Sequence, residues 1–204
     1  MRIIYPAIFG IIILVTLGLY VNRGMRDTEK AEEEFEKYES SELSKATFAG
    51  GCFWGVEKTF QEKEGVKEAI SGYTGGKTKN PTYKQVSKGD TGHYEAVRVY
   101  YEPDKISYNQ LLQIFWKNID PTDSGGQGPN RGSQYRTAIF YQNQNQKQLA
   151  EESKKQLYDS EEQEKEIDTK ILEAKEFYPA EKYHQDYYVN EESSNCNSCS
   201  KYIF

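Results

Sequence analysis

Apolar residues in the middle of the chain recur with two different periods. Short runs that are wholly apolar, or that alternate with polar residues, predict strands, whereas apolar residues three and four positions apart predict helices. The predicted strands cover residues 46–49, 66–71, 93–101, 135–141 and 170–177. Helical spacing begins after Cys52, at Ser107 and around residue 149. This alternation predicts an α+β fold, a two-layer sandwich with a mixed, ferredoxin-like sheet that contains βαβ units.

Local signals bound two of these helices. The helix after Cys52 has apolar residues at helical spacing from Phe53 to Phe60, and Gly65 is expected to end it. Ser107, with a glutamine three residues later, has the sequence of a capping box, and Pro121 is expected to stop the helix that follows. The apolar stripe of that second helix is expected to form core.

The clearest strand covers residues 93–101. With a period of two, His93, Glu95, Val97, Val99 and Tyr101 share one face. If that face is buried, Glu95 loses hydration and its pKa rises, which suits a general acid. The alternative is that Glu95 lies at a strand end and reaches water. The strand pattern alone leaves both open.

The first residues of the chain differ in composition from the rest. Residues 3–21 are nearly all apolar, a length that is about enough to cross a bilayer core. A cleaved signal peptide is less favoured, because no small-x-small cleavage site follows. We therefore expect a transmembrane helix within residues 1–22, with the catalytic domain outside the cytoplasm. Residues 23–45 are dense in Glu and Lys and predict a solvated tether with nothing to bury.

Length and charge set limits on the remaining organisation. The 204 residues suit one globular domain, which we place at residues 46–190 and follow with a cysteine-bearing tail, residues 191–204. The net charge of −6 offers no basic stripe for phosphates, so nucleic acid is not an expected partner. A small-molecule or protein substrate fits better, and we expect a monomer.

Cys52 follows two glycines that permit a tight turn and lies where a helix begins. A thiol at a helix N-terminus faces the positive end of the helix dipole, which favours the thiolate. Cys52 is therefore a candidate nucleophile. The alternative, a small buried apolar residue, would not require the paired glycines or the two aromatic residues that follow.

The other two cysteines, Cys196 and Cys199, lie in the polar tail with two residues between them. Only two histidines accompany the three cysteines, so a metal site is not expected, and neither is a cofactor. One thiolate at a helix N-terminus together with thiols in a tail suits redox chemistry, in which a resolving cysteine forms a disulfide with an oxidised nucleophile.

Five segments of this chain resemble the successive signatures of the A-class peptide methionine sulfoxide reductases, over Thr47 to about Tyr188. They occur in the order that the family has. The segments are Gly51–Gly55, Gly92–Val97, Asp120–Thr122, Gln134–Ile139 and Tyr178–Gln185.

The resemblance implies a role for each matching residue. Cys52 would attack the sulfoxide sulfur, and Glu95 would protonate the sulfoxide oxygen. Phe53 and Trp54 would line the pocket for the substrate methyl group, and Tyr83 and Tyr135 would hydrogen-bond the sulfoxide oxygen. Asn130 and His184 are further expected substrate-binding residues.

The resemblance further implies that Cys52 becomes a sulfenic acid and that Cys196 forms a disulfide with it. Cys199 could then take over the disulfide before thioredoxin or a similar dithiol reduces it. The expected activity is repair of methionine S-sulfoxide, in proteins or free.

Two features depart from the family pattern. Asn130 stands where the family usually has Asp, so a carboxylate is absent there and only hydrogen bonding remains. The tail also lacks the glycine-rich sequence that often separates recycling cysteines, which puts the role of Cys199 in question.

Two other classes of function compete with the reductase. A cysteine acyl-transfer enzyme would use Cys52 with His184 or His93 as the base, but it has no use for two tail cysteines. A membrane-tethered interaction domain would need Cys52 only as a structural residue.

Overall fold

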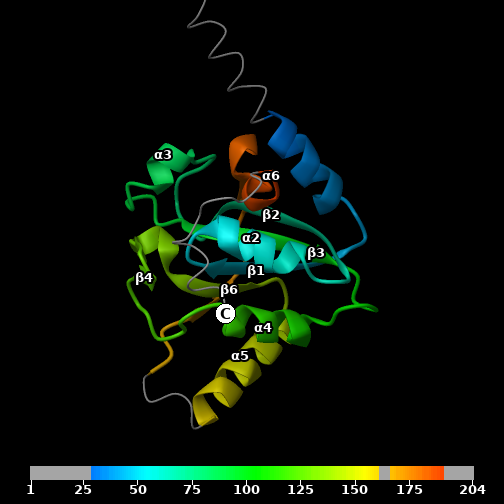
Figure 1. Cartoon of the computed structure of the whole chain (residues 1–204), viewed down its shortest axis with the longest axis vertical. Coiled ribbons are helices and arrows are strands. Elements are labelled where there is room, and N and C mark those ends of the chain that lie inside the picture. Colours follow the sequence, from blue (N-terminus) through cyan, green and yellow to red (C-terminus); the bar gives the residue numbers. More distant parts are fainter. Residues whose placement is uncertain (1–28, 161–165, 191–204) are drawn as a thin grey trace, which may run out of the picture.

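The computed structural model describes residues 29–160 and 166–190 and shows a mixed sheet with helices on both faces (Figure 1). The sheet has six strands, in the spatial order β7-β6-β1-β3-β2-β8. The strands are β1 (Ser44–Gly50), β2 (Val66–Thr74), β3 (Tyr94–Tyr101), β6 (Thr137–Tyr141), β7 (Lys170–Glu173) and β8 (Tyr178–Pro179), and a separate hairpin is formed by β4 (Gly126–Gln127) and β5 (Asn130–Arg131).

A helix covers residues 29–39 and precedes the sheet. The other helices are α2 (Phe53–Gln61), α3 (Tyr83–Val86), α4 (Tyr108–Lys117), α5 (Gln144–Asp159), α6 (Tyr187–Asn190) and two 3₁₀ helices, η1 (Ser133–Tyr135) and η2 (Lys182–His184). Three of these helices, α2, α4 and α5, are those that the sequence predicts, and the four shorter ones are additional.

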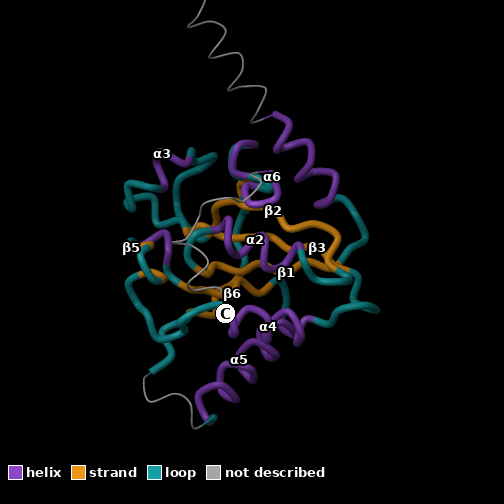
Figure 2. The backbone as a smooth tube through the Cα atoms, in the orientation of Figure 1, coloured by secondary structure: helices purple, strands orange, loops and turns teal. Residues whose placement is uncertain are grey.

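The strand pairing confirms the predicted mixed sheet. β3 lies between β1 and β2 and pairs antiparallel with both, so β1-α2-β2 is a split βαβ unit. β6 pairs antiparallel with β1, and α4 connects β3 to β6 across β1 in the same manner. The one parallel pairing joins β6 to β7, with α5 as the connection. Figure 2 shows the strands as a single layer crossed by these helices.

One face of the sheet carries the larger apolar core, under α2, α4 and α5. Phe48 of β1 is at its centre, stacked on Phe60 of α2 at 5.0 Å and on Phe115 of α4 at 5.1 Å between ring centroids. Ser107 caps α4 through the predicted capping box, with its hydroxyl accepting from the Gln110 backbone N–H. The periodic apolar residues of α2 and α4 therefore serve as core, as the sequence indicates.

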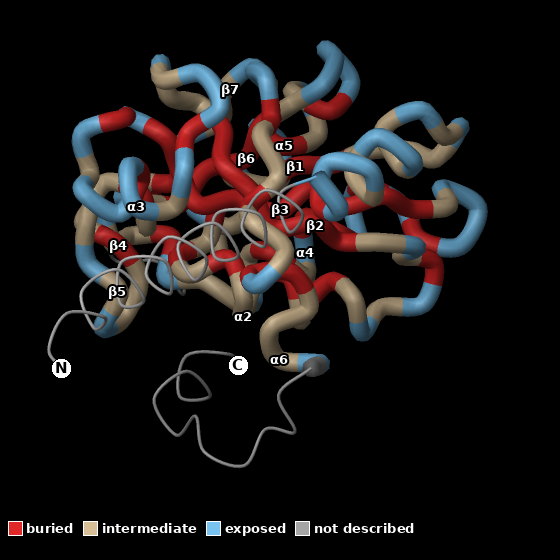
Figure 3. Tube along the Cα trace, turned by 90° about the horizontal axis from the view of Figure 1, so that it is seen from above, coloured by how far each residue is buried: buried red, intermediate tan, exposed pale blue. Residues whose placement is uncertain are grey.

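β3 is buried on both faces, because it is a central strand with elements packed above and below it (Figure 3). Val97, Val99 and Tyr101 point into the core beneath α2, as their period predicts. The alternate residues, including Tyr94 and Tyr100, enter a second core on the opposite face. Glu95 thus belongs to the face that α2 covers, and it does not reach water at a strand end.

The helix over residues 29–39 covers part of that opposite face, so this part of the expected tether does bury side chains. Ala31 is buried, and the ring of Phe35 stacks on Phe177 at 5.6 Å between centroids. The Arg98 guanidinium lies over the Phe177 ring, 4.6 Å from its centroid. A few small and aromatic residues are enough to dock a helix whose other residues are charged.

Glu39, at the end of this helix, meets two residues of β3. Its Oε2 accepts from Arg98 Nη1 at 3.1 Å and from the Tyr100 hydroxyl at 2.8 Å. Lys45 of β1 lies 3.2 Å from the other carboxylate oxygen. These contacts satisfy the buried Arg98 and fix the chain just before it enters the sheet.

The fold prediction is wrong about the transmembrane helix, and the helix over residues 29–39 adds a cover on the second face of the sheet that a two-layer sandwich does not have. The segment on which that prediction rested, residues 3–21, lies outside the described residues. Across residues 29–160 and 166–190, no helix combines the length and the apolar character needed to cross a membrane. The longest described helix, α5, has 16 residues rich in Gln, Lys and Glu, whereas a span needs about 20 apolar ones. The predicted membrane anchor and the predicted extracytoplasmic location are therefore not supported.

We predict that Phe35→Ala lowers the free energy of unfolding by about 1–2 kcal/mol, because it removes a half-buried ring stacked on Phe177. Urea denaturation measures the change. Glu33→Ala, on an exposed position of the same helix, is the control and should leave stability nearly unchanged. Equal stabilities of Phe35→Ala and Glu33→Ala would show that the helix does not dock.

Candidate active site

Cys52 lies at the N-cap of α2, between the end of β1 and the first helical residue, Phe53. The preceding Gly51 has a φ of +89°, a conformation that favours glycine. A Cβ on Gly51 would also lie 2.7 Å from the Gln127 side chain. The turn therefore needs glycine for two reasons, and it delivers the thiol to the helix N-terminus as the sequence predicts.

Glu95 lies directly beneath this turn. Its Oε2 accepts a hydrogen bond from the Phe53 backbone N–H at 3.2 Å, and the residue is only 1% exposed. Burial raises the pKa of Glu95 to about 8, against the opposing effects of the Phe53 N–H and of a hydrogen bond from Tyr135. A carboxyl group with this pKa is largely protonated at neutral pH, so it can donate a proton next to Cys52.

Tyr83 and Tyr135 complete the polar side of the site. Tyr83 begins α3 and Tyr135 ends η1, and the two side chains form a hydrogen bond with each other. Burial raises the pKa of both hydroxyls, and the nearby Glu95 and Cys52 raise them further. Both tyrosines therefore remain neutral hydrogen-bond donors.

Aromatic rings form the other side of the site. The Trp54 indole stacks on Tyr187 of α6, with centroids 3.7 Å apart and planes within 5°. Its Nε1 donates to His184 Nδ1 at 3.2 Å. The His184 ring lies 5.1 Å from Phe53 and 4.5 Å from Tyr83 between centroids. The structure thus gathers the predicted aromatic residues around His184.

The two histidines do not suit a base for acyl transfer. His184 accepts at Nδ1 from Trp54, and burial lowers its pKa to about 4, which makes it a weak base. His93 has both ring nitrogens engaged, Nδ1 by the Gly76 N–H and Nε2 by the Thr78 carbonyl at 2.7 Å. These contacts assign both rings to structural positions.

Asn130 lies in β5 of the short hairpin. It lines a groove that also contains Cys52, and none of Phe53, Trp54, Tyr83, Glu95 and Tyr135 lines that groove. Cys196 and Cys199 lie outside the described residues.

Glu181 is a residue of the site that the sequence reasoning missed. Its two carboxylate oxygens accept from the Tyr73 hydroxyl and from the Tyr83 backbone N–H, each at 3.0 Å. Glu181 thereby ties the segment before η2 to β2 and to the start of α3. It lies inside one of the family-like segments, but the sequence carries no signal of its own for this contact.

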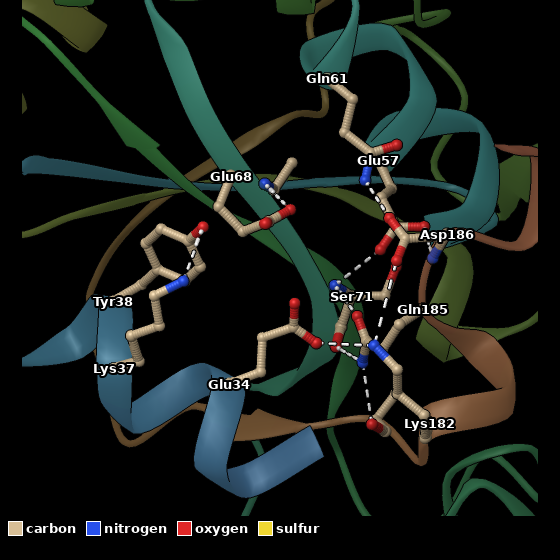
Figure 4. A network of polar contacts seen from close by, with 12 residues as sticks. Glu34, Lys37, Tyr38, Glu57, Gln61, Glu68, Ser71, Lys182, Gln185 and Asp186 are labelled. Atoms are coloured by element: carbon tan, nitrogen blue, oxygen red, sulfur yellow. Dashed lines mark hydrogen bonds and ion pairs between the residues drawn. The ribbon is translucent and has the colours of Figure 1, made fainter. Parts of the chain in front are cut away.

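Glu57 of α2 is a second missed residue, and it holds the segment before α6 (Figure 4). Its carboxylate accepts from the Asp186 backbone N–H at 3.0 Å and from the Ser71 backbone N–H at 3.3 Å. It is 1% exposed, and burial followed by the nearby Asp186 carboxylate raises its pKa to about 8. The sequence did carry one signal for the burial of Glu57, because this residue lies on the apolar stripe of α2 between Phe53 and Phe60.

Gln185 and Gln61 strengthen the same attachment. The Gln185 side chain donates to the Ser71 and Ala180 carbonyls at 2.9 and 2.8 Å and accepts from the Ser71 N–H at 3.0 Å. Gln61 donates to the Asp186 carboxylate at 2.7 Å. Asp186 has a φ of +56°, so the chain turns sharply where these bonds hold it.

Comparison with known proteins agrees with this geometry. Residues 44–202 match the family model described as "Peptide methionine sulfoxide reductase". The chain is 57% identical over 143 residues to the peptide methionine sulfoxide reductase MsrA of Bacillus licheniformis, covering 70% of this chain and 79% of that protein. The corresponding protein of Bacillus subtilis is 54% identical over 143 residues, with 70% and 81% covered.

Solved structures show the same fold. Methionine sulfoxide reductase A of Corynebacterium diphtheriae superposes with a TM-score of 0.69 and 32% identity, over 79% of this chain and 81% of that one. Reduced Mxr1 from Saccharomyces cerevisiae gives a TM-score of 0.70 and 30% identity, over 76% and 90%.

The fold, the site and these comparisons define the chain as a thiol-dependent oxidoreductase that acts on methionine sulfoxide. It belongs to the peptide methionine sulfoxide reductase family, and its activity is that of a peptide-methionine (S)-S-oxide reductase.

We predict that Glu57→Gln makes stability less dependent on pH between about 6.5 and 8. Over this window the native state keeps a proton on Glu57, because its pKa is raised to about 8, whereas the unfolded state has lost it. Stability therefore falls as pH rises, by about 1.4 kcal/mol per pH unit for each retained proton. Urea unfolding at several pH values gives the slope.

The exposed Glu64, just beyond α2, provides the control for this measurement. Glu64→Gln should keep the wild-type slope, and Glu95→Gln should reduce it as Glu57→Gln does, since Glu95 also retains its proton. A wild-type slope in Glu57→Gln would mean that Glu57 is ionised in the folded chain.

Proposed function

We propose that this chain reduces methionine S-sulfoxide through nucleophilic attack by Cys52 on the sulfoxide sulfur. The Cys52 thiolate supplies an electron pair, and the oxygen passes to it as the sulfoxide is reduced to the thioether. Cys52 is left as a sulfenic acid and methionine departs. The substrate sulfur is thus reduced by two electrons, and the Cys52 sulfur is oxidised by two electrons.

Glu95 serves as the general acid in this proposal. A proton on the sulfoxide oxygen makes the sulfur more electrophilic, and Glu95 has the raised pKa that lets it hold that proton at neutral pH. Tyr83 and Tyr135, neutral donors next to Glu95, would hydrogen-bond the same oxygen. Negative charge that develops there would then meet three donors in a site of low polarity.

The aromatic side chains would bind the substrate methyl group. Phe53 and Trp54 present apolar surface, and a sulfonium-like transition state gains further from ring faces. His184 orients Trp54 through the Nδ1 hydrogen bond and stays neutral, because its pKa is lowered to about 4. Asn130 would contribute hydrogen bonding from the groove side, where the family usually has a carboxylate.

The catalytic cycle then needs resolution of the sulfenic acid. Cys196 of the tail would attack the Cys52 sulfur, forming a disulfide and releasing hydroxide, and Cys199 would exchange with that disulfide. Thioredoxin or a similar dithiol would restore the thiols. Yeast Mxr1 has been solved in complex with Trx2, and that structure, at 21% identity and a TM-score of 0.50, shares the fold of this chain.

The observation that carries the proposal is the hydrogen bond between Phe53 N and Glu95 Oε2 at 3.2 Å. This bond holds the Glu95 carboxyl group against the residue that follows Cys52, at the N-terminus of the same helix, which supports the pairing of the two roles. A proton donor and a thiolate so close together suit the transfer of oxygen from one sulfur to another.

We predict that Cys52→Ser abolishes reduction of methionine sulfoxide with dithiothreitol, because it removes the thiolate that would accept the oxygen. Cys196→Ser should still release one methionine per enzyme but stop thioredoxin-driven cycling. Methionine is measured by chromatography, in a single turnover and at steady state. Disulfide-linked peptides are identified by mass spectrometry after one turnover.

Cys199→Ser is the matched control, since it keeps Cys196 and should allow a Cys52–Cys196 disulfide to accumulate. Retained turnover in Cys52→Ser would refute the mechanism. Unimpaired thioredoxin-driven cycling in Cys196→Ser would remove that residue from its proposed role.

We predict that Glu95→Gln slows the single-turnover rate by about 10²-fold with little change in substrate binding, because general acid catalysis is lost. In the wild-type chain the rate should decline as pH rises past about 8, where Glu95 loses its proton. The variant should lack this decline. Rapid-quench rates are measured from pH 6 to 9.5 at several sulfoxide concentrations. The concentration series separates an effect on the chemical rate from an effect on substrate binding.

A wild-type rate in Glu95→Gln would make Glu95 a structural residue only. Glu181→Gln offers a comparison nearby, since it alters a carboxylate that contacts Tyr73 and Tyr83 without facing Cys52. It should retain the decline above pH 8.

A further inference from the structure

An apolar groove runs along α2 from Cys52, between α2, α4 and the β4–β5 hairpin. Val56 and Phe60 form one wall, Phe115 and Ile119 form the other, and Pro129 lies at the hairpin side. Gly50 keeps the floor open, because a Cβ there would lie 3.0 Å from Ile119 and 3.2 Å from Val56. Such a groove suits a short apolar segment.

The groove shares Cys52 and Asn130 with the proposed substrate site, but its apolar walls are not among the residues proposed to contact the substrate. Glu95, Tyr83, Tyr135 and Trp54 do not line the groove. The function of the groove is therefore not explained by binding of the sulfoxide group or of its methyl.

The last described helix, α6, contributes to this groove. Tyr188 of α6 is one of the lining residues. The turn just before α6 is fixed to α2, by the bond from the Asp186 N–H to Glu57 and by the bond from Gln61 to the Asp186 carboxylate. The last described helix is therefore attached to α2 and shares a groove with Cys52.

The sequence of residues 191–204 contains one apolar segment. Its first residues are polar, Cys196 and Cys199 follow, and then come Lys201 and the apolar residues Tyr202, Ile203 and Phe204. These three residues are the part of this tail that gains most from burial.

We propose that the groove along α2 binds Tyr202–Phe204 and thereby presents a tail cysteine to Cys52. This inference rests on the proposed function, in which a tail cysteine resolves the Cys52 sulfenic acid. The groove from Cys52 to Phe60 follows about eight helical residues, or roughly 12 Å. Tyr202–Phe204 lie three to five residues beyond Cys199, an extended length of about 10–18 Å.

Cys196 can also reach the nucleophile with the same residues bound. It lies six to eight residues before them, which allows up to about 20–29 Å of chain. Cys196 lies eight residues after Tyr188, so the connection back to α6 is long enough as well. Anchoring at both ends would raise the effective concentration of the thiols near Cys52.

The position of the groove suits the chemistry of resolution. Displacement at sulfur places the attacking and leaving atoms in line, on opposite sides of the attacked atom. The tail thiolate would approach Cys52 from the groove, form the S–S bond and expel hydroxide toward the Glu95 side, where a proton makes it water. The two sulfurs end at equal oxidation states, and no further oxidant is required.

The test compares two double variants of the full chain. The serine variant carries Ile203→Ser and Phe204→Ser, and the control variant carries Ile203→Val and Phe204→Leu. Each reduced protein is mixed with one equivalent of methionine sulfoxide without reductant and quenched over time. Methionine is measured by chromatography, and the Cys52 disulfide and the trapped sulfenic acid are measured by mass spectrometry. We expect equal methionine release and about tenfold slower disulfide formation only in the serine variant.

A groove variant, Ile119→Thr, provides an independent measurement and should slow disulfide formation in the same way. Disulfide formation at the wild-type rate in the serine variant would overturn the proposal. If Ile119→Thr instead raises the methionine sulfoxide concentration needed for methionine release while the serine variant has no effect, the groove binds substrate and the proposal is wrong. Absence of methionine release in the wild-type chain would instead refute the proposed function.

Discussion

The hydrogen bond from the Phe53 N–H to Glu95 is the contact on which the site depends. Glu95 lies on a central strand that is covered on both faces, where a carboxyl group without a partner would be costly. The first turn of α2 has N–H groups that the helix itself cannot satisfy, and one of them meets this need. The order β1-β3-β2 makes the meeting possible, because α2 must cross over β3 to connect its two neighbours. Cys52 and Glu95, the proposed nucleophile and acid, are thus brought together by the topology.

The sequence was sufficient wherever a short-range signal determined the structure. The helix from Phe53, the capping box at Ser107 and the alternating faces of residues 94–101 all depend on neighbours within a few positions, and all are confirmed. The burial of Glu95 was not decided by its strand period, because a period assigns a residue to a face without showing what covers that face. The covering element is α2, some 40 positions earlier in the chain.

Long-range contacts explain most of what the sequence reasoning missed. The charged segment before β1 was interpreted as a tether because its composition is polar, yet the contacts of Glu39 with Arg98 and Tyr100 lie some 60 residues away. Glu57 was overlooked because a carboxylate within a helix usually faces water. Its two backbone donors come from β2 and from the turn before α6, and no local pattern could have brought them together.

The two buried carboxyl groups against α2 share a property that bears on the nucleophile. Burial raises the pKa of both Glu95 and Glu57 to about 8, so at neutral pH both are largely uncharged. An ionised Glu95 would occupy the positive end of the α2 dipole and repel a thiolate at Cys52. A protonated Glu95 is uncharged, so the α2 dipole can stabilise the Cys52 thiolate. It also retains a proton that it can donate to the sulfoxide oxygen. The same burial that makes Glu95 an acid therefore favours, in the proposed mechanism, the reactive form of Cys52.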